Sequence, residues 1–314
     1  MPAELDPHAY ALQRIRTLTP EFTWTPKADE AWRSTLRQRL IQATGLKIEP
    51  TSLDPKRTKD HLTFTSAPGM RVFAYDLQPT KPTKTAIICL PGHGIGVDAI
   101  VGKAPRDYQN QFALQCVQQG YRTLAIEPAS FGHRRSSCET EAQSSCHRDA
   151  TAALMLGETM TAWRVRDAMA AVTLLKSEGI ERVAIMGISG GGQTAFWTAA
   201  LDPRIDAAIV SGYFNTFQDS ILSIHHCIDN YIPALSTIVE MPDIAALIAP
   251  RLLFVESGDQ DPIFPKRAFQ RAVKRAKEIY NNEPGFESHL FKGDHIFNGT
   301  RAFKFLQKHL PPHP

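Results

Sequence analysis

The stretch "MGISGGGQT", residues 186–194, joins a run of apolar residues to a run typical of a helix. The preceding "RVAIMGIS" has the continuous apolar character of a strand buried on both faces. The following "GGQTAFWTAAL" predicts a helix. Between them, Gly187, Ser189 and Gly191 match G-x-S-x-G, a pattern in which the serine occupies a sharp strand-to-helix turn. The stretch therefore predicts a turn that holds the Ser189 hydroxyl clear of a sheet.

Such a turn needs glycine near the serine for a steric reason. The serine takes an unfavourable backbone conformation, and neighbouring backbone can pass only where no Cβ collides with it. Ser189 also precedes a predicted helix, whose unpaired N–H groups favour negative charge. The alternative is an ordinary glycine-rich corner between a strand and a helix, in which the serine has no chemical role.

Strand and helix patterns alternate along most of the chain. Eight segments have strand character: residues 61–66, 70–79, 85–92, 121–128, 182–189, 206–213, 251–259 and 287–295. Helical patterns occupy residues 28–45, 107–120, 159–179, the segment from 191, and the basic stretch 266–277. This alternation predicts an α/β fold with a mostly parallel sheet and helices on both of its faces.

The length of 314 residues, of which 43 % are hydrophobic, is enough for one large domain. We expect residues 1–60 to form an N-terminal helical extension packed on the core, and residues 61–314 to form the α/β domain. Two segments interrupt the rhythm. Residues 130–157 are polar and irregular, and residues 213–248 contain helical pieces broken at Pro233 and Pro242. We interpret both as small cap-like insertions, because long excursions from a regular fold tend to be functional.

Composition excludes several classes of partner. Lys and Arg number 35 against 32 for Asp and Glu, an excess too small to predict binding to nucleic acid or to an anionic membrane. No run of about 18 apolar residues predicts a membrane span, and the N-terminus lacks the pattern of a secretory signal. The five cysteines are an odd number without metal-site spacing, so we expect free thiols and a cytoplasmic location. A homo-oligomer remains compatible with the sequence.

A serine on such a turn needs an acid and a histidine later in the chain. The strand at 251–257 is followed by two aspartates, Asp259 and Asp261. We favour Asp261, because it lies three residues beyond Gly258 and Pro262 fixes its backbone. Asp259 then forms the turn by bonding local backbone. A carboxylate at this place can hold a histidine in the orientation and tautomer that catalysis needs.

His295 is the predicted base. It follows the last strand in "FKGDHIFNG", on a loop from which its side chain can reach over the edge of the sheet. A lone histidine is more often structural than catalytic. Here, however, Ser189, Asp261 and His295 come in the expected order at the expected strand ends, which favours a triad.

A serine hydrolase site also needs backbone N–H groups that stabilise the developing oxyanion. The residue after the serine, Gly190, supplies one of them. The other is expected from the loop after the strand at 85–90, which reads "PGHGIG", and we assign it to His93, with Gly94 as the alternate. The loop can also be a tight turn that needs small residues, and that structural explanation is compatible with the role of oxyanion donor. The His93 side chain, as distinct from its N–H, can line the pocket.

Aromatic residues near the expected site are candidates for substrate contact. Tyr213, Phe214 and Tyr231 lie just after a strand whose carboxyl end faces the site, and Phe131 lies in the polar segment. They suit an apolar or aromatic group, although a place in the core of a cap explains them equally well.

The segment His225-His226-Cys227 with Asp229 has the residue types of a metal site but none of the usual spacings. We therefore expect a structural or pocket-lining role and neither metal nor cofactor. Arg164 on the long helix is expected to be scaffolding, or else to recognise a substrate carboxylate.

These residues resemble the α/β-hydrolase superfamily, and within it the serine esterases similar to dienelactone hydrolases and acetyl xylan esterases. The resemblance spans roughly residues 30–310, and "LPGHGIG", "GISGGGQT", "HHCIDNYIP", "IAPRLLFVESGDQDPIFP" and "GDHIFNG" are among its carriers. It implies an eight-stranded, mostly parallel sheet and metal-free hydrolysis of carboxylic esters through an acyl-enzyme. By position it implies Ser189 as nucleophile, Asp261 as acid and His295 as base.

The chain departs from these relatives at two positions. Dienelactone hydrolases carry a cysteine nucleophile where this chain has Ser189, so their substrate does not transfer. Sugar-deacetylating esterases usually have a longer side chain, often Gln, where this chain has Gly190, which puts acetylated carbohydrate in doubt.

The sequence therefore predicts a serine hydrolase that acts on a small-molecule ester. The same triad serves amides and thioesters, so a peptidase, an amidase or a thioesterase is the alternative enzyme. The alternative from another class is a ligand-binding protein that keeps the fold without turnover.

Overall fold

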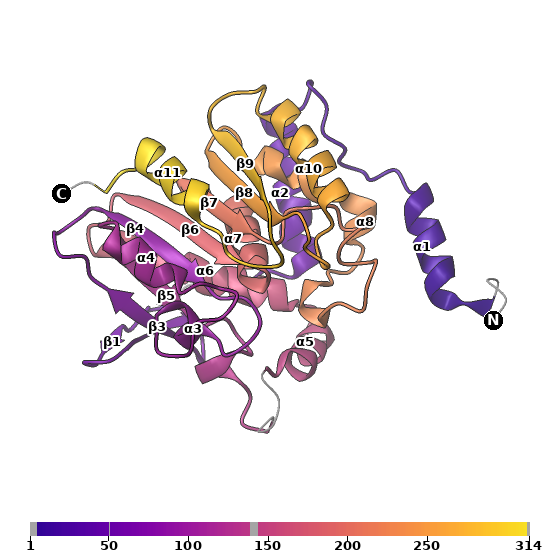
Figure 1. Ribbon diagram of the computed structural model, residues 1–314. Coiled ribbons are helices and arrows are strands. Elements are labelled where there is room, and N and C mark those ends of the chain that lie inside the picture. The colour runs from indigo at the N-terminus through magenta and orange to yellow at the C-terminus, as the bar shows by residue number, and fades with distance from the viewer. Residues whose placement is uncertain (1–4, 50, 139–143, 313–314) are drawn as a thin grey trace.

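The computed structural model describes residues 5–49, 51–138 and 144–312. Within these residues the fold is built on one sheet of nine strands (Figure 1). The strands are β1 (Lys56–Arg57), β2 (Leu62–Ala67), β3 (Met70–Leu77), β4 (Thr85–Leu90), β5 (Arg122–Ile126), β6 (Arg182–Ile188), β7 (Ala207–Ser211), β8 (Leu252–Gly258) and β9 (Phe286–Phe291). Eight of them are those that the sequence predicts. The ninth, β1, has two exposed residues and therefore no apolar alternation that could reveal it.

The strand order is β1-β2-β3-β5-β4-β6-β7-β8-β9. Strands β1 to β3 are antiparallel, and all neighbours from β5 to β9 are parallel. The chain passes from β4 to β5 on one side and then crosses back to β6 on the other side of β4. Such a reversal places ligand sites at the carboxyl ends of the strands concerned. Leu90 at the end of β4 pairs in register with Gly187 in β6, so the loops that follow both strands are neighbours.

Helices cover both faces of the sheet. One apolar cluster joins it to α2 (Glu30–Thr44), α6 (Met160–Ser177), α7 (Gly190–Leu201) and α10 (Lys266–Ile279). A second cluster, on the other face, joins it to α3 (Val97–Ile100), α4 (Phe112–Gln118) and α11 (Thr300–His309). Strand β4 is apolar throughout because both of its faces are buried. Ile88 and Leu90 belong to the first cluster, and Ile87 and Cys89 belong to the second.

The N-terminal segment contains one predicted helix and one that was not predicted. Helix α2 begins after Asp29, whose carboxylate accepts a hydrogen bond from the Trp32 N–H at 2.9 Å, and it ends at Gly45 with φ at 69°. Leu36 and Leu40 bury its inner face in the first cluster. Helix α1 (Pro7–Thr17) lies at the periphery and has no buried residue, which is why no periodic apolar pattern reveals it (Figure 1).

The two insertions contain more regular structure than the sequence predicts. In the first lie a short 3₁₀ turn, η2 (Gly132–Arg134), and α5 (Cys146–Met155), while residues 139–143 fall outside the described part. In the second lie η3 (Ile228–Asn230), α8 (Leu235–Ile238), α9 (Met241–Ile244) and η4 (Ala245–Leu247). The helical pieces are interrupted close to Pro242, as predicted, because α8 ends at Ile238 and α9 begins at Met241. Pro242 sits in the first turn of α9, where its missing N–H costs nothing.

No helix in the described part of the chain has both the length and the apolar character needed to cross a bilayer.

Replacing Leu40 with Ala should lower the free energy of unfolding by about 2–5 kcal/mol, because a fully buried Leu leaves a cavity when truncated. Urea denaturation followed by circular dichroism measures this loss. Gln42→Ala is the control, since Gln42 is exposed on the same helix and should change the free energy by about 0.5 kcal/mol or less. Equal, small effects at the two positions would contradict the packing of α2 on the sheet.

Candidate active site

Ser189 occupies the turn between β6 and α7 with φ 56° and ψ −121°. A Cβ on Gly191 would lie 2.0 Å from the Leu90 carbonyl oxygen, and a Cβ on Gly187 would lie 2.3 Å from the carbonyl of Gly191. Both distances are far below contact distance, so neither glycine can be replaced without a shift of backbone. The Ser189 N–H donates to the Ser211 carbonyl at 3.0 Å and ties the turn to β7. The strained serine is thus held in place from both sides.

Asp261 and His295 form a close pair. Nδ1 of His295 lies 2.7 Å from Oδ2 of Asp261, whose side chain is fully buried. The other carboxylate oxygen, Oδ1, accepts the N–H groups of Ile263 at 2.8 Å and Phe264 at 3.0 Å. These three bonds orient the carboxylate, and the bond to Nδ1 leaves Nε2 of His295 for another partner.

The His295 ring has close packing partners. It stacks between Tyr108 and Phe264, with ring centroids 5.7 and 5.8 Å away. It also lies against Gly212, where a Cβ would approach Cε1 of the ring to 2.8 Å. The position of the imidazole is therefore set by its neighbours as well as by Asp261.

Asp259 does not contact His295, but it also does not bond local backbone as the sequence predicted. Its Oδ1 accepts the Gly293 N–H at 3.1 Å, and its own N–H donates to the Phe291 carbonyl at 2.8 Å. These bonds join the loop after β8 to the loop after β9. Asp259 thereby supports the segment that carries His295.

Glu256 in β8 supports the same segment from the interior. Its Oε1 accepts the N–H groups of Asn298 and Gly299 and the hydroxyl of Ser211, at 2.9 to 3.1 Å. Burial of this carboxylate raises its pKa to about 7, against the opposing effect of these hydrogen bonds. Nothing in the sequence marks this residue, since a glutamate in an apolar strand has no characteristic pattern.

Ser189 and His295 open into one cavity of about 320 Å³. The residues that line it are His93, Tyr108, Ser189, Ile224, His225, His226, Cys227, Ile263 and His295. The segment 225–227 therefore lines the cavity, which was one of the two roles expected for it. Tyr108 was missed, because a tyrosine between a loop and a helix carries no local sign of where its ring will lie.

The loop after β4 runs beside Ser189. A Cβ on Gly92 would lie 3.1 Å from Cβ of Ser189 and 2.3 Å from the Tyr108 hydroxyl. That hydroxyl donates to the His93 carbonyl at 2.6 Å, and the Gln109 side chain accepts the Gly92 N–H at 2.7 Å. The loop predicted to supply an oxyanion donor is thus fixed next to the start of α7, where Gly190 is the first residue.

The aromatic residues predicted to contact substrate do not line this cavity, although the Phe131 ring packs against His93. Phe131, Tyr213 and Phe214 are at most 1 % exposed, and Tyr213 and Phe214 pack with Phe196 in the first cluster. Tyr231 is 37 % exposed, and its hydroxyl donates to the Ile221 carbonyl. The prediction is corrected accordingly: burial of apolar area draws three of these rings into the protein, and four of the nine residues that line the cavity are histidines.

A buried polar cluster adjoins the cavity. His93, Cys146, Cys227 and Asp229 bring one ligand-type atom each within 4.8 Å of one another. Arg164 is also there, and it donates to Asp229 at 2.6 Å and to the Cys146 sulfur at 3.2 Å. The Arg164 guanidinium already balances the negative charge of the Asp229 carboxylate, so we interpret the cluster as a hydrogen-bonded network. Arg164 is 1 % exposed, which places it in the scaffold and not in contact with a substrate.

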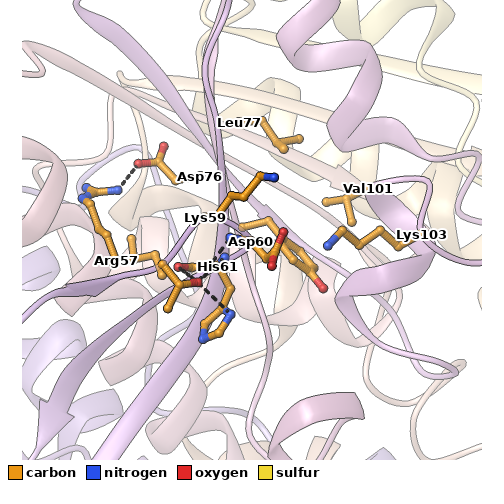
Figure 2. Close-up of a pocket in the computed structure, with 11 residues that line it drawn as sticks. Arg57, Lys59, Asp60, His61, Asp76, Leu77, Val101 and Lys103 are labelled. Atoms are coloured by element: carbon orange, nitrogen blue, oxygen red, sulfur yellow. Dashed lines mark hydrogen bonds and ion pairs between the residues drawn. The ribbon is translucent and has the colours of Figure 1, made fainter.

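A second cavity of about 320 Å³ lies beside β1 and β3, away from Ser189 (Figure 2). Figure 2 shows Arg57 paired with Asp76 on its wall. Thr58 and His61 also meet there at 3.1 Å, but the Thr58 oxygen accepts the N–H groups of Asp60 and His61 within a tight turn. These contacts explain the residues structurally, and the cavity offers no comparable serine, acid and histidine.

Residues 56–295 match the model of the Abhydrolase family, which is about three quarters of the chain. The chain belongs to the Abhydrolase family. A proposed hydrolase of Bacillus subtilis strain 168, YtaP, is 27 % identical over 221 residues, which is 66 % of this chain and 71 % of that protein. The family and the arrangement of the sheet together establish the α/β-hydrolase fold.

The fold of this Abhydrolase chain is also similar to those of solved structures. A proposed acetyl xylan esterase from Bacteroides fragilis superposes with a TM-score of 0.73 at 17 % identity, over 96 % of this chain and 89 % of that one. A glucuronoyl esterase from Caldicellulosiruptor kristjansonii gives 0.66 at 15 % identity, over 94 % and 90 %. At these identities the likeness concerns the fold.

In this Abhydrolase chain, Gly191→Ala should lower the free energy of unfolding by about 3 kcal/mol or more, because the new Cβ meets the Leu90 carbonyl oxygen. Thermal and urea denaturation measure the change. Gly179→Ala is the matched control: φ there is +87° but no atom lies within 4 Å of the new Cβ, so only backbone strain of about 1–2 kcal/mol is added. A smaller loss at 191 than at 179 would be inconsistent with the tight turn.

Proposed function

We propose that this protein is a serine hydrolase that cleaves small carboxylic esters through an acyl-enzyme. The proposal is carried by one observation: His295, oriented by the buried Asp261, shares a cavity with a serine on a strained strand-to-helix turn. The relatives with solved structures are named as esterases, and this supports ester hydrolysis among the reactions open to the fold.

Each member of the triad has a role that follows from its surroundings. Ser189 attacks the carbonyl carbon, and Nε2 of His295 takes its proton, since Nδ1 is engaged by Asp261. The carboxylate of Asp261 stabilises the imidazolium that forms. His295 then gives the proton to the departing alcohol, and a water molecule cleaves the acyl-enzyme by the same route.

The oxyanion is stabilised by backbone donors. Gly190 begins α7, so its N–H has no partner within the helix, and its direction along the helix axis favours negative charge. The N–H of His93, on the adjacent loop, is the second donor. Both groups are held by packing before the substrate arrives, which is what makes such donors effective.

Ser189→Ala should reduce hydrolysis of p-nitrophenyl acetate by about 10³-fold or more, because the acyl-enzyme cannot form. Release of p-nitrophenol measures the rate. Ser177→Ala, on the distant and exposed end of α6, should hydrolyse as fast as the wild type. Matched p-nitroanilide and thioester substrates separate esterase from amidase and thioesterase activity. Undiminished hydrolysis by Ser189→Ala would refute the proposal.

The two neighbouring aspartates offer a direct comparison. Asp261→Asn should lower kcat by about 10²- to 10⁴-fold, because an amide at this position no longer stabilises the His295 imidazolium. Asp259→Asn should lower kcat by about tenfold or less, since Asp259 contacts the loop backbone and Lys266 and does not contact His295. Steady-state kinetics on p-nitrophenyl acetate give both values. The reverse order would assign the acid to Asp259 instead.

A further inference from the structure

The side chain of His93 is more specifically placed than the backbone role assigned to it requires. Its Nε2 lies 2.9 Å from Oδ2 of the buried Asp229, so this nitrogen is occupied. The rest of the ring faces Gly190, and both Nδ1 and Cε1 lie 3.1 Å from the point that a Cβ on Gly190 would occupy. The side chain is 30 % exposed and lines the cavity that contains Ser189.

Gly190 is also the residue whose N–H is expected to meet the oxyanion. A side chain at this position would press against the His93 ring, and the absence of one leaves the space to the imidazole. The ring therefore approaches the same end of α7 that the carbonyl oxygen of an ester must approach. Its Nδ1 is the ring nitrogen that Asp229 leaves available.

We propose that the His93 side chain donates its Nδ1–H to the carbonyl oxygen of the bound ester, as a third oxyanion donor beside the two backbone N–H groups. This inference rests on the hydrolase function proposed above. It assigns His93 a catalytic role and Asp229 a positioning role, since Asp229 acts only through the histidine.

The donation requires a doubly protonated ring. Nε2 donates its N–H to the Asp229 carboxylate, so in a neutral ring Nδ1 would carry a lone pair that points toward the oxyanion and repels it. Burial disfavours the charged ring, but the Asp229 carboxylate outweighs it and raises the pKa of His93 to about 9. The donor is therefore present at neutral pH and is lost as the pH rises through about 9.

The groups around His93 support this charge. Burial alone would raise the pKa of Asp229, but Arg164 and His93 outweigh it and hold that pKa well below its ordinary value. Cys146 contacts Asp229 at 3.5 Å and His93 at 3.9 Å, and a hydrogen bond with Cys227, together with Arg164, lowers its pKa. The buried Asp229 carboxylate thus lies between two cations, Arg164 and His93.

His226, Tyr108 and Cys227 also line the cavity, and their pKa values are not shifted toward 9. Burial lowers the pKa of His226, which keeps that ring neutral at pH 7. Burial raises the pKa of Tyr108 well above its ordinary value. The pKa of Cys227 is raised as well, by its hydrogen bond with Cys146 and by burial.

The test compares two His93 variants of the full chain on p-nitrophenyl acetate at pH 7. His93→Phe keeps a ring without a donor, and kcat should fall about 100- to 1000-fold with little change in KM. His93→Gln keeps a neutral N–H donor and should stay within about tenfold of the wild type. His133→Gln is the control, because His133 pairs with Asp98 at 3.2 Å outside the cavity and should leave kcat unchanged.

The pH profile provides a readout that a purely structural role would not move, and it needs no variant of His93. In the wild type, kcat/KM should fall on the alkaline side with an apparent pKa of about 9. In Asp229→Asn the carboxylate that raises the pKa is gone, so this limb should shift to lower pH by one unit or more. Thermal denaturation of each variant shows that it is folded.

The outcomes separate the two proposals. Labelling of Ser189 by diisopropyl fluorophosphate, absent in Ser189→Ala, reports the hydrolase function independently of His93. If the wild type is labelled and active while folded His93→Phe keeps kcat within threefold, the His93 donor is wrong and the hydrolase stands. If the alkaline limb of the kcat/KM profile does not move in Asp229→Asn, the His93 donor is also wrong. A wild type that neither reacts with the label nor hydrolyses esters removes both.

Discussion

The close crossing of β4, β6 and α7 is the constraint on which the site depends. At this point the backbone turns through a positive φ at Ser189, while the chain at Gly191 passes the Leu90 carbonyl at a distance that no side chain permits. The strain at Ser189 persists because strands and helix on both sides determine its position. The same crossing sets the loop after β4 against Ser189, so one packing arrangement places the proposed nucleophile and the proposed oxyanion donors together.

Buried carboxyl groups then fix the loops that the sheet alone leaves free. Asp261 orients His295, Glu256 holds the segment beyond it, and Asp229 with Arg164 holds His93. Each carboxylate is almost fully buried, and each has several hydrogen-bond donors, which is what makes such burial tolerable. Because removing one partner leaves a buried charge uncompensated, these networks bind distant loops into a rigid site. They pair segments that lie far apart in the chain.

Local patterns explain why much of the site could be predicted. The strand-to-helix turn at Ser189 has its own sequence pattern, and Asp261, the aspartate that Pro262 follows, is the one that contacts His295. The aromatic residues Tyr213 and Phe214 follow a strand end in the same way, yet their rings turn into the core. Position at a strand end predicts the neighbourhood of a residue, but the direction of its side chain depends on the space that packing leaves.

By itself, the sequence determined the alternation of strands and helices and the turn at Ser189, because each is written in residues close together in the chain. The tertiary structure alone decided that His93 meets Asp229, that Tyr108 stacks on His295, and that the segment 225–227 forms a wall of the cavity. The physical reason is that such contacts arise where separate segments pack together, and their geometry follows from the shape of the whole interior and from no local pattern.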